Sequence, residues 1–230
     1  MSGPFTIAVS ASESTARGVE SARACLHAAG YETRTFDAAG YGGPALEEFV
    51  RAGHAAGVLD LTTADLATEL VGGTASGSDR LTAAALAGVP QVISPGGLDA
   101  VAYGPPETVP TRFGSRRLHH HGTAVTLVRT TPEENDRLGQ EVAMKACAAR
   151  GPTAIVISLR GVSSLDIEGG PFWWPEADAA LFQSLRNWVY GVELIELDLH
   201  INDPEFGRAC AETLLRLLGV TNVSQSTRGY

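Results

Sequence analysis

Three histidines lie together in the segment Arg116-Arg-Leu-His-His-His-Gly122, which holds half of the chain's six histidines. In an extended strand, His119 and His121 would point to the same side. Two imidazoles at that spacing suit a divalent metal ion or an acid/base pair, because histidine binds metals and exchanges protons near neutral pH. Surface histidines beside arginines are the alternative. A complete metal site would also need a further ligand, for which His200 or Asp203 is the candidate.

A second polar cluster, His200-Ile-Asn-Asp-Pro-Glu205, follows an apolar stretch. Asp203 before Pro204 is typical of a helix start, where the carboxylate caps the helix and proline takes the first helical position. That structural role does not explain His200 or Asn202. We therefore predict a catalytic role for His200 and Asp203 and a ligand-binding role for Asn202.

Other polar or glycine residues follow short apolar runs that should be strands. They are Asp60, Thr62, Thr63, Ser94, Gly96, Gly97 and Ser163. Ligands of open α/β sheets bind beyond the carboxyl ends of the strands, where loops and helix N-termini converge, so we predict that these residues bind ligand. Lys145 is the only lysine and lies mid-helix, which leaves Arg129 as our candidate for holding an anion. An ordinary ion pair is the alternative for Arg129.

The elements that would position these residues alternate between apolar runs and helical patterns. Strands are expected near residues 5–9, 31–36, 57–61, 91–94, 153–158 and 192–200, with helices near 16–29, 44–54, 63–71, 81–86, 175–190 and 203–218 and another that begins at 131. This alternation predicts a doubly wound, mostly parallel sheet with helices on both faces, a Rossmann-like three-layer α/β sandwich. In the last strand, Glu196, Asp198 and His200 alternate with apolar residues, which places that strand at or near a sheet edge.

Two long segments, residues 95–118 and 159–174, have no clear period, and long irregular loops in compact domains are usually functional or disordered. We expect residues 95–118 to close over the ligand as a lid, and self-association into a homo-oligomer to order them. A static surface loop is the alternative. The turn Gly72–Ser78 begins like a phosphate-binding loop but continues with Ser78-Asp79 where Lys and Ser/Thr belong, so we interpret it as a flexible turn.

Composition sets the broad class of the protein. A length of 230 residues without a linker predicts a single α/β domain over 1–230, and 44% hydrophobic residues suffice for a compact core. The chain has no signal-like start and no apolar run of roughly 20 residues, so we expect a cytoplasmic protein without a membrane partner. A net charge of −9 argues against nucleic acid. Three widely spaced cysteines indicate reduced thiols.

Five motifs, in order over nearly the whole chain, carry a resemblance to a known family: Asp60-Leu-Thr-Thr-Ala-Asp-Leu-Ala-Thr-Glu-Leu-Val-Gly-Gly73, Ser94-Pro-Gly-Gly-Leu-Asp-Ala-Val-Ala-Tyr-Gly-Pro105, Arg129-Thr-Thr-Pro-Glu-Glu134, Gly161-Val-Ser-Ser-Leu-Asp166 and His200-Ile-Asn-Asp-Pro-Glu-Phe206. The chain resembles the second α/β lobe of the tomato mosaic virus resistance-type ATP-binding domain family. Where that family has His-x-His-Asn, this sequence has His119-His-His121-Gly122 and lacks the amide. The resemblance implies a nucleotide- or small-molecule-binding protein and supplies no reaction. ATP with magnesium is therefore one candidate cofactor, beside the divalent metal that the histidine spacing suggests.

Two hypotheses of different classes follow. The first is a small-molecule enzyme, a hydrolase or carbon–carbon lyase acting on an anionic metabolite, in which a histidine moves a proton while backbone amides and Arg129 stabilise negative charge. The second is a non-catalytic ATP- or nucleotide-binding lobe that works with a companion chain carrying the missing first lobe.

Overall fold

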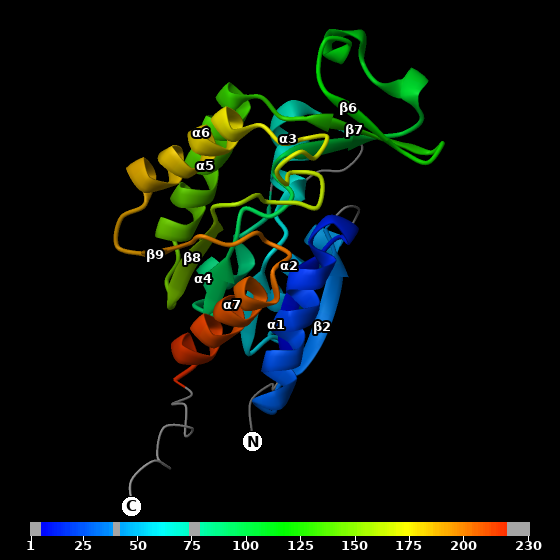
Figure 1. Cartoon of the computed structure of the whole chain (residues 1–230). Coiled ribbons are helices and arrows are strands. Elements are labelled where there is room, and N and C mark those ends of the chain that lie inside the picture. The colour runs from blue at the N-terminus through cyan, green and yellow to red at the C-terminus, as the bar shows by residue number, and fades with distance from the viewer. Residues whose placement is uncertain (1–5, 39–41, 74–78, 220–230) are drawn as a thin grey trace, which may run out of the picture.

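The computed structural model describes residues 6–38, 42–73 and 79–219 (Figure 1). Its main sheet has six parallel strands in the order β2-β1-β3-β4-β8-β9. Their bounds are β1 Thr6–Ala11, β2 Glu32–Asp37, β3 Gly57–Asp60, β4 Gln91–Ile93, β8 Thr153–Ser158 and β9 Glu193–Leu197. The predicted parallel α/β architecture is confirmed, and β9 lies at a sheet edge as predicted. The expectations for residue 5, for 74–78 of the glycine-rich turn and for the tail after 219 fall outside the described residues.

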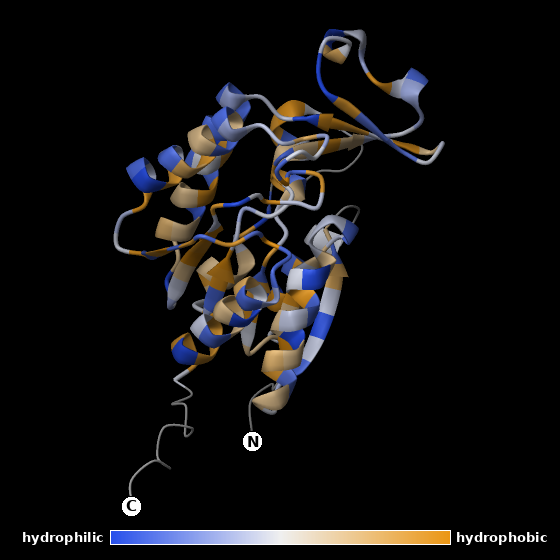
Figure 2. Cartoon of the chain, viewed as in Figure 1, coloured by the Kyte–Doolittle hydropathy of each residue, from blue (hydrophilic) through white to orange (hydrophobic). Residues whose placement is uncertain are grey.

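Helices cover both faces of this sheet. On one face, α1 (Ala16–Ala28) and α7 (Pro204–Leu217) lie side by side (Figure 1). The other face carries α2 (Gly42–Arg51), α3 (Ala64–Val71), α4 (Ala83–Ala87), α5 (Pro132–Cys147) and α6 (Pro175–Trp188). Alternate strand residues point to opposite faces, so Ile7 and Val9 pack against α1 and α7 while Ala8 packs against α2. Figure 2 shows hydrophobic residues gathered on the strands and on the helix faces that meet them.

The strand order reverses direction between β1 and β3. From β1 the chain runs through α1 on one face to β2, and it returns through α2 on the other face to β3, so β1 ends up between β2 and β3. The loops that leave β1 and β3 therefore diverge at this point. Such a topological switch is where open α/β sheets bind ligands.

Two glycines allow α1 and α7 to approach closely. A Cβ at Gly207 would lie 2.0 Å from the backbone oxygen of Gly18, and one at Gly18 would lie 2.1 Å from the backbone oxygen of Ile201. We predict that Gly207→Ala lowers the free energy of unfolding by about 2 kcal/mol, because the helices must move apart. Exposed Glu212 of the same helix is the control, and Glu212→Ala should change stability by about 0.5 kcal/mol at most. Equal urea midpoints for the two variants would contradict the prediction.

A second, antiparallel sheet lies beyond the carboxyl ends of the main strands and projects from the molecule in Figure 1. Its strands, in the order β5-β7-β6, are β5 Ala100–Tyr103, β7 Val125–Arg129 and β6 Leu118–His121. The expectation that 95–118 is irregular throughout is wrong for 100–103, which pair with 126–129. The sequence Ala-Val-Ala-Tyr is too short and too small-sided to show a strand period, and its partner comes more than twenty residues later.

None of the helices in the described part of the chain has the length and apolar character needed to cross a membrane.

Candidate functional site

A cavity of about 440 Å³ lies between the ends of β1 and β3 and the small sheet, and we call it the switch cavity. Its described lining comes from within the segments 12–14, 64–68, 97–104, 121–127 and 163–165, together with Ala38. The loop after β1, the first turns of α3, strands β5 and β7 and the loop after β8 therefore surround one space. It lies where the strand order reverses, the position at which open α/β sheets bind ligands.

Asp99 is the most deeply buried acid of this cavity, with 0% of its surface exposed. Its Oδ2 accepts a hydrogen bond from Ser163 Oγ at 2.6 Å, whereas Oδ1 has no hydrogen-bond partner among the described residues. Burial raises the pKa of Asp99 to about 6, although the nearby guanidinium of Arg129 opposes the rise. The cavity thus contains a carboxyl group that changes charge close to neutral pH.

The raised pKa of Asp99 makes the stability of the fold depend on pH. Its pKa of about 6 in the folded protein exceeds the ordinary value of 3.8, so the folded state keeps a proton that the unfolded chain releases. The stabilisation from this proton is complete below about pH 4 and is lost as pH rises through about 6. We predict that, between about pH 4 and pH 7.5, the wild type loses on the order of 2–3 kcal/mol more than Asp99→Asn. Urea unfolding at both pH values measures this, and parallel losses in the two proteins would contradict it.

Asp65, at the start of α3, brings a second acid to the switch cavity and belongs to a buried ion cluster. Arg80 donates from Nε to Asp65 at 2.6 Å, from both Nη atoms to Asp60 at 2.9 and 2.6 Å, and from Nη1 to Glu47 at 3.0 Å. Asp65 Oδ1 has no hydrogen-bond partner among the described residues. Burial raises the pKa of Asp65 to about 6, against the opposing effect of Arg80.

Arg129 stands at the centre of another buried cluster. Its Nη2 lies 2.6 Å from Asp178 and 3.6 Å from Asp166, and its Nε donates to the backbone oxygen of Phe172 at 2.8 Å. Burial raises the pKa of Asp166 to about 6 and raises that of Asp178 as well. The guanidinium predicted to hold an anion is therefore engaged inside the protein, and it is not among the described residues that line the cavity.

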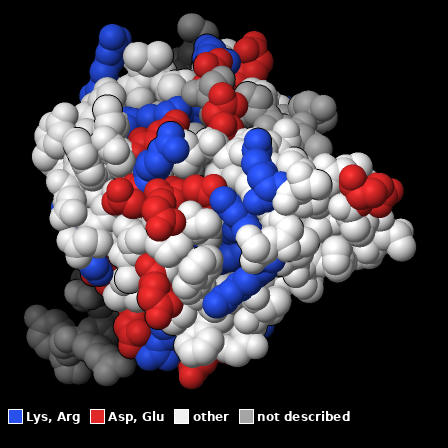
Figure 3. Space-filling model, turned by 90° about the horizontal axis from the view of Figure 1, so that it is seen from above, with Lys and Arg blue, Asp and Glu red and all other residues white. Residues whose placement is uncertain are grey.

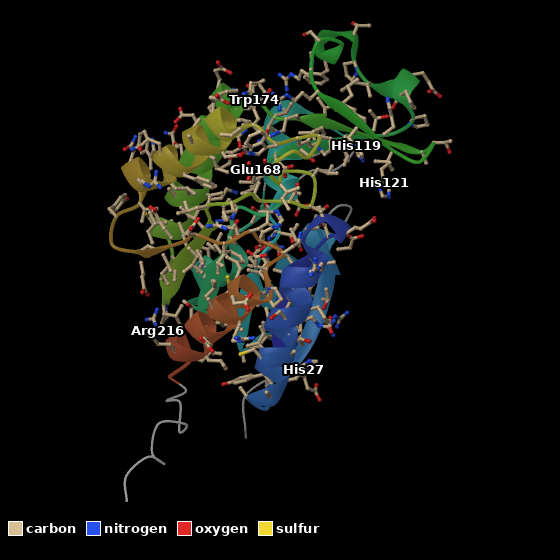
Figure 4. All side chains as sticks on the ribbon, viewed as in Figure 1. His27, His119, His121, Glu168, Trp174 and Arg216 are labelled. Carbon is tan, nitrogen blue, oxygen red and sulfur yellow. The ribbon has the colours of Figure 1, made fainter. Side chains whose placement is uncertain are left out.

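His119 and His121 lie on the same face of β6, on the side of the small sheet that faces the rest of the molecule (Figure 4). His121 lines the switch cavity, and its Nε2 is 3.3 Å from Oε2 of exposed Glu13. The His119 ring meets Phe172 edge-on, with ring centroids 6.2 Å apart. Of the two, His121 is the one that reaches the cavity.

His200 and Asp203 line a different cavity of about 690 Å³, which we call the loop cavity because the loop after β8 borders it. His200 Nε2 lies 2.9 Å from the backbone oxygen of Ser163, and Nδ1 accepts the N–H of Asn202 at 3.1 Å. Both ring nitrogens are thus engaged, which requires the neutral ring with its proton on Nε2. Asp203 precedes α7 as predicted, but its carboxylate accepts the N–H of His200 at 2.8 Å and not one from the first helical turn.

Four of the remaining predicted residues form the framework under the switch cavity. Thr62, Thr63 and Ser94 are fully buried, and Thr62 Oγ1 is 2.7 Å from Thr15 Oγ1 across the switch point. Asp60 is held by Arg80 and accepts a hydrogen bond from Ser10 at 2.6 Å.

Two further predicted residues lie against the backbone of neighbouring segments. Asn202 Oδ1 accepts the N–H groups of Arg17 and Gly18, at 3.2 and 3.4 Å, and so caps α1. A Cβ at Gly96 would lie 2.1 Å from the backbone oxygen of Leu61, so this position needs glycine. Gly97 and Ser163, in contrast, line the switch cavity together with His121.

Sequence reasoning missed three acidic residues of the cavity, Glu13, Asp65 and Asp99. Each lies a few residues beyond the end of a predicted strand, whereas most of the predicted ligand-binding residues are the first ones after a strand. Asp99 was recognisable as the one carboxylate beside the Gly96-Gly97 turn. Within the described ranges, no group of three or more His, Cys, Asp or Glu side chains is placed to hold a metal ion.

The surface on the small-sheet side of the molecule carries charges of both signs. Figure 3, which looks down onto this side, shows Asp and Glu side chains adjoining Lys and Arg. Such a surface does not attract ligands of one sign. Any charge preference must therefore come from the lining of the cavity.

Residues 5–218 match the C-terminal domain of the uncharacterised protein family UPF0261. A UPF0261 protein of Clostridium tetani is 44% identical over 207 residues, which cover 89% of this chain and 51% of that protein. One from Rhizobium meliloti is 43% identical over 185 residues, or 79% of this chain and 46% of the relative. The ToMV resistance protein Tm-1(GCR237) of Solanum lycopersicum is 37% identical over 219 residues, which cover 94% of this chain and 29% of that protein. The chain thus spans about half the length of these bacterial relatives.

Proposed function

This chain belongs to the uncharacterised protein family UPF0261, as its C-terminal domain, and we propose that it is a small-molecule enzyme, a hydrolase or carbon–carbon lyase, working in the switch cavity. The observation that carries this proposal is Asp99, a fully buried carboxyl group with a pKa of about 6 and an unpaired oxygen. A carboxyl group of this kind can take and return a proton near neutral pH, as both reaction classes require.

The neighbours of Asp99 support this role. Ser163 donates to one of its oxygens and so fixes the carboxyl plane, while the other oxygen has no hydrogen-bond partner among the described residues. His121, close to Glu13 at another part of the lining, is our candidate for the second proton-transfer group, because imidazole can act as acid or base. The expectation of an anionic substrate rested on Arg129. Because that guanidinium is engaged elsewhere, we retain the proposed reaction class but no longer propose that the substrate is an anion.

The histidines allow a direct test of this location. We predict that His121→Ala lowers turnover about 100-fold, because it removes a proton-transfer group, and that His200→Gln changes turnover by about threefold at most. His200 already uses both ring nitrogens and lines the loop cavity. Turnover is followed by mass spectrometry as the loss of metabolites from a cell extract incubated with each protein. A large loss with His200→Gln and none with His121→Ala would move the chemistry to the loop cavity.

A second candidate function is an ATP-binding lobe that needs a companion. The observation in its favour is length, since the chain spans 51% and 46% of two bacterial relatives, which leaves room for a first lobe. The switch cavity by itself does not suit a triphosphate. Its described lining includes Glu13, Asp65 and Asp99 and no lysine or arginine. Phosphate-binding cations would therefore have to come from the companion.

Calorimetry separates these two functions. If the second candidate function is correct, titration of ATP and magnesium into this chain alone should give no heat. A binding isotherm should appear only when the first-lobe segment of a relative is also present. Absence of heat in both cases removes it. Binding to this chain alone would contradict the statement that the acidic cavity does not suit ATP.

A further inference from the structure

We propose that the switch cavity takes a small molecule bearing a protonated amine, and that the ammonium group is held by Asp65. This inference rests on the proposed function for the location of the site, and it adds the class of substrate. Asp99 keeps its proton-transfer role, so the two buried acids of the cavity have different tasks.

One carboxyl oxygen of Asp65 is the first feature that points to an amine. This side chain is 1% exposed, and Arg80 occupies only Oδ2, at 2.6 Å. Oδ1 has no hydrogen-bond partner among the described residues, although Asp65 lines the cavity. A buried acceptor without a partner costs about 1–3 kcal/mol, and a ligand that donates a hydrogen bond recovers this energy. An ammonium group offers three donors and no acceptor, so it matches a carboxylate oxygen.

The charge balance around Arg80 is the second feature that points to an amine. Arg80 is a single cation in contact with three carboxyl groups, those of Glu47, Asp60 and Asp65. When all three are ionised, the cluster lacks positive charge. Glu13 and Asp99 add further acids to the cavity, and the described lining contains no lysine or arginine. A ligand with an ammonium group supplies the missing charge, whereas a carboxylate or phosphate is repelled.

The rest of the lining indicates the body of the ligand. Small aliphatic residues and one aromatic ring face the same space, namely Ala100, Ala102, Tyr103, Val125 and Leu127. Apolar walls with a few polar groups are typical of small-molecule sites, where the polar groups fix the orientation. The expected ligand is therefore an amine with an alkyl or aryl body.

Titration of Asp65 gives this binding a pH dependence with a definite sign. Burial raises the pKa of Asp65 to about 6, and only its ionised form attracts an ammonium group. The groups that act on it are Arg80, which lowers its pKa, and Asp60 and Asp37, which raise it, while Glu47 shares the same arginine. Alkylamines stay protonated over this whole pH range, since their pKa values lie near 10. As pH is raised toward 6, amine affinity should therefore increase about tenfold per pH unit, and above pH 6 it should level off.

The test uses butylamine, benzylamine and 1,4-diaminobutane as probes, with butyrate, benzoate and succinate as matched anions. Binding is followed by methyl NMR of the wild type, because Val125, Leu127 and Leu165 report on the switch cavity. We expect shifts of these methyl groups with the amines and none with the carboxylates. Asp65→Asn should weaken amine binding about tenfold or more. Asp198→Asn, which changes an exposed acid paired with Arg160, should leave it unchanged.

Several outcomes would overturn the inference. These are equal or stronger shifts with the carboxylates, no response to any of the amines, unchanged amine affinity in a folded Asp65→Asn variant, or shifts confined to residues of the loop cavity such as Leu159 and Ile167. Failure of the proposed enzyme function looks different. It would appear as turnover that Asp99→Asn leaves intact, whatever charge the cavity prefers.

Discussion

Replacing Arg80 by methionine should lower the free energy of unfolding by about 3–5 kcal/mol near neutral pH, because it leaves three buried carboxyl groups without their cation. Arg80 is 1% exposed and contacts Asp60, Asp65 and Glu47 at 2.6 to 3.0 Å. Glu47 also accepts the N–H groups of Leu81 and Ala83, both at 2.7 Å, so repulsion in the cluster would disturb the start of α4. Urea unfolding of both proteins measures the loss.

The matched control for Arg80→Met is Arg51→Met. Arg51 also pairs with acids, Glu48 and Asp79, but its side chain is 43% exposed. Exposed pairs of this kind contribute about 0–1 kcal/mol, so the control should unfold close to the wild type. The loss in Arg80→Met should also shrink as pH falls, because Arg80 lowers the pKa of Asp65 and its removal lets this carboxyl group take up a proton more readily. Equal losses in the two arginine variants would show that the buried cluster has no special role.

Asp99→Asn should lower kcat about 100- to 10,000-fold on a substrate found by metabolite profiling, since it removes the proton-transfer group while keeping the shape of the side chain. The amide oxygen can still accept the hydrogen bond from Ser163, so the fold should be retained. The wild type should show a limb in its pH–rate profile near the pKa of about 6, and the variant should lack it.

Asp198→Asn serves as the control for that kinetic experiment. Asp198 is exposed and pairs with Arg160 at 2.7 Å, so its replacement should change kcat by about twofold at most. An Asp99→Asn variant with the activity and pH profile of the wild type would place the proton transfer on another group.

Local sequence patterns were sufficient for much of the fold. Thr131-Pro-Glu-Glu134 forms the capping box that starts α5, with Thr131 Oγ1 accepting the N–H of Glu134 at 3.3 Å. The alternation in 192–200 placed β9 at the edge of the sheet. The small sheet was missed because β5 is only four residues long and pairs with a distant strand.

The site was harder to predict, because its contacts join residues far apart in the chain. Arg80 meets Glu47 from 33 positions away, and Ser163 meets Asp99 from 64 positions away. The spacing of residues within one short segment does not predict such pairs. The strand-end rule selected the edge of the sheet where the switch cavity lies, yet it could not tell that Thr62 and Ser94 are framework while Asp99 lines the cavity. Nor could it show that His121 and His200 would line separate cavities.

The measurement that tests the central claim most directly is enrichment of small molecules from a cell metabolite extract, by equilibrium dialysis and mass spectrometry, with one cavity filled at a time. Ala102→Trp fills the switch cavity, and Ala179→Trp is the matched substitution in the loop cavity. We predict that the metabolites enriched by the wild type are retained by Ala179→Trp and lost by Ala102→Trp, with both variants folded. Loss in Ala179→Trp and retention in Ala102→Trp would contradict the assignment of the functional site to the switch cavity.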